Sequence, residues 1–142
     1  MPLKFKRAFE HDWPLPSRHS PGAAGYDLRN AKDDVVIYPG TIELIPTGWC
    51  VEVPPGYVGI VKDRSGHARA GITTHAGVID SDYRGEVIVM LGNATESPAR
   101  INKASRIAQL LIVPCLMTDA EEVGELTDTE RGSNGFGSTG ML

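Results

Sequence analysis

Short apolar runs that alternate with proline- and glycine-containing turns dominate the middle of this chain of 142 residues. Such runs occupy positions 35–38, 42–45, 49–53 and 57–61. Turn signals spaced about 8–12 residues apart predict an all-β sandwich or barrel. Because no long stretch has the helical period of about 3.6 residues, the pattern argues against an α/β fold.

Two further strands are predicted outside this central region. Residues 3–6 alternate between apolar and basic side chains, which is typical of an edge strand, and the prolines between positions 14 and 21 then interrupt regular structure. The aliphatic run 106–114, which follows a polar connection at 93–103, predicts a strand buried on both faces. Gln109 is a polar residue within it, and its amide needs either backbone or ligand partners.

A β-hairpin is predicted around positions 73–91. Residues 73–79 are expected to be extended, Ser81-Asp82 to form the turn, and residues 85–91 to form a second strand rich in Val and Ile. Gly77 and Gly85 mark points where the backbone bends or is approached closely.

The turn of this hairpin brings several reactive groups together. It holds Asp80 and Asp82 together with Tyr83 and Arg84. Neighbouring carboxylates seldom have equivalent surroundings, so one can act as a general base while the other remains structural. A solvated polar turn has the same composition, and the turn alone leaves both interpretations open.

Two more segments carry candidate polar sites. At 63–71, Ser65 is expected to cap one helical turn, and Arg64 adds a planar donor fork, so the Arg-Ser-Gly turn is a candidate phosphate cradle. His67 is expected to be a partly exposed histidine on that helical turn. At 21–29 a loop of small residues leads into a strand with Asp27, which either bonds to backbone amides or supports a hydrated magnesium ion.

The C-terminal region differs from the rest of the chain. Residues 121–130 are acidic and predict a solvated linker, and residues 131–140 are rich in glycine. Phe136 resembles a ring presented for stacking on a base. Donor groups suited to phosphate lie on both sides of it, in Arg131, Ser138 and Thr139. We therefore predict one β domain at 1–128 and a flexible lid at 129–142.

Composition excludes several classes of protein. The formal net charge of -4 argues against direct nucleic-acid binding. The longest apolar runs are of strand length, so no membrane span is expected. No apolar signal core follows the basic N-terminus, so export is not expected. Cys50 and Cys115 lie in apolar contexts, which predicts buried thiols in a reducing cytoplasm. His11 and His19 are expected to be surface histidines, and without a Cys/His cluster a zinc site is not expected.

Five segments together resemble the five ordered motifs of the homotrimeric deoxyuridine triphosphatase (dUTPase) family. The resemblance covers nearly the whole chain. The segments are Pro-Gly-Ala-Ala-Gly-Tyr-Asp-Leu at 21–28, Asp-Arg-Ser-Gly at 63–66, Gly-Val-Ile-Asp-Ser-Asp-Tyr-Arg-Gly-Glu at 77–86, Arg-Ile-Ala-Gln-Leu at 106–110 and Arg-Gly-Ser-Asn-Gly-Phe-Gly-Ser-Thr-Gly at 131–140.

The resemblance implies a jelly-roll-like β fold, a homotrimer whose active sites each draw on three chains, and hydrolysis of dUTP to dUMP and pyrophosphate. Asp80 is then expected to activate the attacking water and to contact the deoxyribose, and Tyr83 to exclude a 2′-hydroxyl. The implied deoxyuridine site comprises Thr74, Gly77, Val78, Ile79, Asp80, Tyr83, Phe136 and Gly137.

The same resemblance assigns the phosphate chemistry. Asp27 is expected to support Mg²⁺ through water alone, with the ion bound by the substrate phosphates. The implied phosphate-binding residues are Arg64, Ser65, Gly66, Gln109, Arg131, Ser138 and Thr139.

His75 departs from the family pattern, because it stands where small residues are common and places a ring beside the expected uracil pocket. Two other functions fit the same fold. One is a dCTP deaminase, for which the Gly-rich Phe tail is not needed. The other is a non-catalytic trimer that binds dUTP and signals to a protein partner.

Overall fold

Antiparallel strands form nearly all the regular structure in residues 1–140, which are the residues that the computed structural model describes. The all-β prediction is therefore confirmed. The elements are β1 (Lys4–Arg7), β2 (Tyr26–Arg29), β3 (Val35–Ile37), β4 (Ile42–Glu52), β5 (Tyr57–Lys62), α1 (Ser65–Arg69), β6 (Ile72–His75), β7 (Val78–Ile79), β8 (Glu86–Asn93), β9 (Ala99–Ile101) and β10 (Arg106–Pro114).

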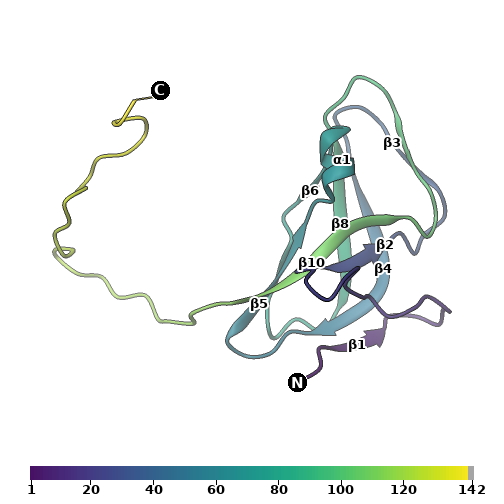
Figure 1. The fold of residues 1–142 in the computed structure, drawn as a ribbon, viewed down its shortest axis with the longest axis horizontal. Helices are drawn as coiled ribbons and strands as arrows, with labels where there is room; N and C mark the ends of the chain where they lie inside the picture. Colours follow the sequence, from purple (N-terminus) through teal and green to yellow (C-terminus); the bar gives the residue numbers. More distant parts are fainter. Residues whose placement is uncertain (141–142) are drawn as a thin grey trace.

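Two four-stranded sheets form the jelly-roll-like body, and their apolar faces share one core (Figure 1). The strand orders are β1-β4-β8-β6 and β2-β10-β5-β7, and β3 pairs with β9 in a small third sheet. Val89 on β8 and Leu110 on β10 are fully buried in the core. β1 lies at a sheet edge, as its alternating pattern predicts, and β10 is an inner strand.

The expected strands 42–45 and 49–53 are in fact one long strand, β4. It continues through Pro46 because a β-bulge shifts the register with β8 between Pro46 and Cys50. Gly48 accommodates the bulge with φ = 79°. Its N–H donates to Glu86 Oε1 (2.8 Å), and its carbonyl contacts the His11 ring nitrogen Nε2 at 2.7 Å. His11 is therefore a half-buried structural residue and not the surface histidine that the sequence suggested.

The extended segment 73–79 does not form a single hairpin strand. β6 pairs with β8 in the first sheet, whereas β7 pairs with β5 in the second. The chain crosses between the sheets at Ala76 and Gly77, which have φ values of 56° and 95°. At Gly77 an added Cβ would lie 2.8 Å from the Val61 carbonyl oxygen, so the expected close approach of backbone at this glycine is confirmed.

Two smaller expectations are also corrected. The connection 93–103 contains β9, so it is not entirely irregular. Cys50 and Cys115 are free, but both are half-buried where full burial was expected. No helix in residues 1–140 is long and apolar enough to cross a membrane.

Candidate functional site

A cavity of about 300 Å³ lies beside the turn that follows β7. The crossing segment between the sheets forms one wall, and side chains of β4 and β8 form another. The lining residues are Leu44, His75, Ala76, Gly77, Val78, Ile79, Asp80, Tyr83, Glu86, Ile88 and Met90. We call this the nucleoside cavity, since its lining combines apolar side chains with the Asp80 and Glu86 carboxylates and the Tyr83 phenol.

Hydrogen bonds within the turn fix the position of Tyr83. Its hydroxyl donates to the Glu86 carbonyl (2.8 Å), and its N–H donates to the Asp80 carbonyl (3.1 Å). The phenol packs on Gly85, where an added Cβ would lie 2.5 Å from the hydroxyl oxygen. Arg84 donates to the Ser81 carbonyl (2.7 Å) and closes the turn. These contacts leave the Asp80 carboxylate exposed at the cavity rim.

His75 also borders the nucleoside cavity, from the end of β6. Its ring lies over Gly92 of β8, where any Cβ would clash with Nε2. The ring therefore occupies space that a side chain at position 92 would otherwise fill.

A second cavity of about 190 Å³ lies at the start of α1, and we call it the phosphate cavity. Arg64, in extended conformation (φ = -88°, ψ = 137°), occupies the N-cap position, so Ser65 is the first helical residue and not the cap. Small side chains at 65 and 66 leave the backbone accessible beside the Arg64 guanidinium. The lining residues are Asp27, Arg64, Ser65, Gly66, His67 and Gln109.

Asp63 connects the elements around the two cavities, a role that the sequence analysis missed. Its carboxylate accepts the N–H of Thr74 (2.5 Å), and its carbonyl accepts the Gln109 side-chain amide (2.8 Å). Gln109 thus satisfies its N–H group on backbone, and its Oε1 lies against Gly25. The position of Asp63, directly before the Arg-Ser-Gly segment, was the signal that could have identified it.

Asp27 reaches the phosphate cavity from β2. Its side chain is 20% exposed, and Oδ2 lies 3.8 Å from Nε of Arg106, on the neighbouring strand β10. The neighbouring Leu28 points into the core, so Asp27 faces the opposite side of the sheet.

His67 is partly exposed on α1, as predicted, and it lines the phosphate cavity. It is half-buried, and its Nδ1 is buried without a hydrogen-bond partner among the described residues. The apolar wall of the nucleoside cavity, formed by Leu44, Ile88 and Met90, was also missed. These side chains come from distant strands, and no local sequence signal marks them.

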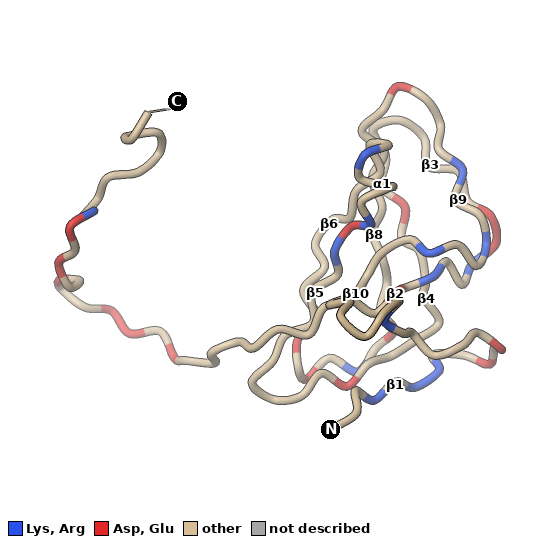
Figure 2. The backbone as a smooth tube through the Cα atoms, viewed as in Figure 1, with Lys and Arg blue, Asp and Glu red and all other residues tan. Residues whose placement is uncertain are grey.

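The predicted tail residues lie apart from both cavities. After β10 the chain leaves the body without forming further strands (Figure 1). Acidic residues are spread along this C-terminal segment up to Arg131 (Figure 2). Phe136 is fully exposed with φ = 50°. Arg131 donates to the Asn134 carbonyl (2.9 Å), within the tail itself. Within one chain the structure therefore groups the nucleoside and phosphate residues and separates Phe136, Gly137, Arg131, Ser138 and Thr139 from them.

The structure is an antiparallel β protein in which one cavity is lined by Asp80 and Tyr83 and another by Arg64 and Gln109. The family model dUTPase matches residues 11–140. The chain therefore belongs to the dUTPase family.

Similar proteins come from bacteria and phages. The deoxyuridine 5'-triphosphate nucleotidohydrolase of Caldanaerobacter subterraneus subsp. tengcongensis is 46% identical over 144 residues, with 98% of this chain and 97% of that protein covered. The corresponding protein of Beijerinckia indica is 47% identical over 132 residues (89% and 82% covered).

Solved structures give the same result. The dUTPase of Staphylococcus bacteriophage 80alpha with dUpNHpp has a TM-score of 0.91 at 30% identity and covers 99% of both chains. A mutant dUTPase from phage phi11 of S. aureus, described with a structural Mg(II) ion, has a TM-score of 0.81 at 25% identity (90% and 100% covered).

Proposed function

We propose that this chain is a dUTP diphosphatase, which hydrolyses dUTP to dUMP and pyrophosphate by attack of water on the α-phosphorus. The observation that carries the proposal is the division of polar groups between two cavities. Asp80 and Tyr83 border one cavity, and Arg64 and Gln109 border the other. A nucleoside triphosphate requires both a cavity for the nucleoside and one for the phosphates.

Asp80 acts as the general base in this proposal. It orients and deprotonates the attacking water and contacts the deoxyribose 3′-hydroxyl, and such proton transfer contributes about 10²–10⁴-fold to rate. Tyr83, held by its bond to Glu86, packs against the deoxyribose and leaves no room for a 2′-hydroxyl. Backbone of residues 77–79 recognises the uracil edge. Thr74, which the sequence predicted for the uracil site, does not line the nucleoside cavity, and its N–H is already bonded to Asp63.

Arg64, Ser65, Gly66 and Gln109 hold the phosphates and place the α-phosphorus for in-line attack. The site also fits Mg²⁺, although no group of three or more His, Cys, Asp or Glu in residues 1–140 could ligate a metal directly. Magnesium keeps several waters and uses substrate phosphates as ligands, so the single carboxylate of Asp27 suits an outer-sphere contact. When bound, the ion supplies neutralisation of phosphate charge.

The assembly that we propose is a homotrimer in which each site draws on three chains. Two features of the single chain support it. The nucleoside and phosphate cavities share no lining residue, and the tail contacts neither. In the trimer the tail, part of the lid at 129–142, supplies Arg131, Ser138 and Thr139 to the γ-phosphate, while Phe136 and Gly137 cover the uracil. Residues 141 and 142 lie outside the described residues.

The other functions that the fold allows are not favoured, because the similar proteins carry the name of the nucleotidohydrolase. A cytoplasmic location completes the proposal. The test is pyrophosphate release with magnesium from dUTP, dTTP, dCTP and UTP in parallel. Release from dUTP alone, lost in Asp80→Asn while nucleotide still binds, is expected. Full-rate turnover by Asp80→Asn would contradict the assignment of the base.

A further inference from the structure

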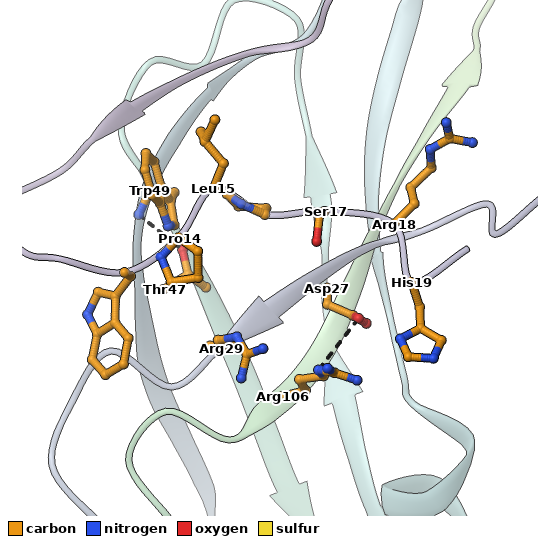
Figure 3. A pocket seen from close by; sticks show the side chains of 12 residues that line it. Pro14, Leu15, Ser17, Arg18, His19, Asp27, Arg29, Thr47, Trp49 and Arg106 are labelled. Carbon is orange, nitrogen blue, oxygen red and sulfur yellow. Dashed lines mark hydrogen bonds and ion pairs between the residues drawn. The ribbon is translucent and has the colours of Figure 1, made fainter. Parts of the chain in front are cut away.

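A third cavity, of about 150 Å³, lies behind the N-terminal loop on the outer side of β2 and β10 (Figure 3). The proposed reaction does not use it. It adjoins the phosphate cavity, because Asp27 lines both. Its other charged lining residues are Arg18, His19, Arg29 and Arg106.

Arg29 and Arg106 stand directly opposite each other in the β2–β10 register. Both guanidinium groups lie on the same side of these strands, next to Asp27 (Figure 3). Like charges at directly opposite strand positions are destabilising. Arginine cannot relieve the repulsion by losing its proton. Asp27 is the single carboxylate among the described lining residues, so it offsets only one of the two positive charges of the Arg29–Arg106 pair.

Hydrogen bonding leaves most donors of this pair unused. Arg29 donates from Nη1 to the Ala104 carbonyl (2.9 Å). The Arg106 side chain is 35% exposed. Its one polar contact among the described residues is the 3.8 Å ion pair with Asp27. Arg18 differs from both, because it donates to the Pro21 carbonyl (2.9 Å) and points away from Arg29 and Arg106 in Figure 3. Two half-buried guanidinium forks thus present free donors to one small cavity.

We propose that this cavity is a second oxyanion site, which binds inorganic phosphate or pyrophosphate between Arg29 and Arg106. Planar guanidinium forks match phosphate oxygens in pairs. The volume corresponds to roughly five water molecules at about 30 Å³ each, which suits a phosphate group. A bound oxyanion neutralises the excess charge and so reduces the repulsion between the two guanidinium groups. The ion enters beside the cavity from which the proposed reaction releases pyrophosphate.

The test is calorimetric titration of phosphate and of pyrophosphate into the full chain with magnesium. The proposed active site is first filled with α,β-imido-dUTP, so that only a separate site can respond. One ion per chain is expected to bind. Arg29→Gln is expected to weaken binding roughly 10–100-fold, the effect of losing a charge-assisted donor, and to retain dUTP turnover. Stronger binding of pyrophosphate than of phosphate would identify the product as the occupant.

Two variants separate a local effect from a general one. Arg100→Gln makes the same change in charge on β9, at a guanidinium that pairs with Asp34, and it is expected to leave anion binding unchanged. Arg29→Lys keeps the charge without the fork and is expected to bind at an intermediate level. It also serves if Arg29→Gln does not fold.

Three results would overturn the proposal. Loss of all anion binding once the analogue is bound would assign the ion to the phosphate cavity. Equal weakening by Arg29→Gln and Arg100→Gln would indicate a general charge effect. No binding by the wild-type chain would mean that the arginines are balanced in another way, for instance by a carboxylate of a second copy. Because anion binding is measured without turnover, the result tests the second anion site independently of dUTP hydrolysis.

Discussion

The body, residues 1–114, and the tail, residues 115–140, solve opposite physical problems. The body buries apolar side chains from two sheets in one core, and strand pairing satisfies its backbone. The tail contains no strand, and all of its residues except Cys115 and Gly135 are exposed. Its acidic run and its glycines cannot bury enough apolar surface to offset the entropy of ordering. A packed body and a shorter, exposed tail therefore coexist in one chain.

This difference determines how the proposed site would work. Residues that need exact placement, Asp80 and Arg64, lie in the body between paired strands. Residues that need to arrive after the substrate, Phe136 and Arg131, lie in the tail. Ordering of the tail over bound nucleotide would exclude water from the reacting centre. Changes in the tail should then affect activity without affecting unfolding, whereas changes in the packed backbone of the body should affect unfolding.

Deletion of residues 131–142 is expected to have the largest effect. Loss of the γ-phosphate donors and the stacking ring should lower kcat/KM for dUTP by about 10²-fold or more, as misplacement of a substrate does. Thermal unfolding of the body should not change. Pyrophosphate release and a melting curve on the same preparation check both statements. A truncated chain with a lowered melting temperature would show that the tail is part of the fold.

Phe136→Ala narrows the test to one ring. Base–aromatic stacking is worth about 1–3 kcal/mol, so kcat/KM should fall roughly 5–150-fold. Phe136→Trp restores a stacking surface and should recover most of the activity, which separates stacking from a general disturbance of the tail. Equal losses in the two variants would argue against stacking.

A pair of glycine substitutions compares the two regions at equal backbone strain. Gly77 (φ = 95°) and Gly137 (φ = 87°) both adopt the left-handed conformation. An added Cβ meets the Val61 carbonyl at position 77 and nothing within 4 Å at position 137. Gly77→Ala should lower the free energy of unfolding by about 1–3 kcal/mol, and Gly137→Ala should leave it unchanged. Denaturant unfolding of both variants is the measurement, and equal midpoints would contradict the comparison.

The smallest effect is expected at the edge of the body, where β9 and the following turn contact Asp34. The Lys103 N–H (2.7 Å) and then the Arg100 guanidinium (2.5 Å) hold the pKa of this carboxyl below its ordinary 3.8. A lowered folded-state pKa means that the stabilisation is complete above pH 3.8 and disappears as the pH falls through the folded-state value. Because Asp34 is exposed, the gain is modest.

Asp34→Asn should therefore have a slightly lower melting temperature than wild type at pH 7 and the same melting temperature at low pH. Asp33→Asn is the control, since that carboxylate is 92% exposed and its contact with the Lys103 ammonium is long, at 3.5 Å. A constant difference across the pH range would exclude the carboxylate as the cause.

The sequence predicted the strands well where apolar runs end at clear turns, as in β1, β5 and β10, although β10 is not buried on both faces as expected. It failed where contacts between residues far apart in the sequence determine the backbone conformation. β4 continues past Pro46 because Glu86 and His11 satisfy the bulged Gly48. Residues 73–79 divide between two sheets because Gly77 turns the chain, and residue-level pattern alone cannot choose between pairing partners.

The same limit applies to the candidate site. Charged and glycine-rich segments identified Asp80, Arg64 and the tail, because their chemistry is local. Asp63 was missed because its function is to connect Thr74 and Gln109 across the fold. Met90 was missed because an apolar residue on a strand carries no sign that it lines a cavity.

The most direct test of a site shared between chains mixes two inactive variants. Chains with Asp80→Asn are co-expressed with chains that lack residues 131–142, and the mixed assembly is purified through a different tag on each. Each variant alone should release almost no pyrophosphate from dUTP. The purified mixed assembly should regain activity in about one third of its sites, because each mixed trimer has one site in which Asp80 of one chain meets the intact tail of another. A mixed assembly as inactive as its parts would contradict the account and place the complete site within one chain.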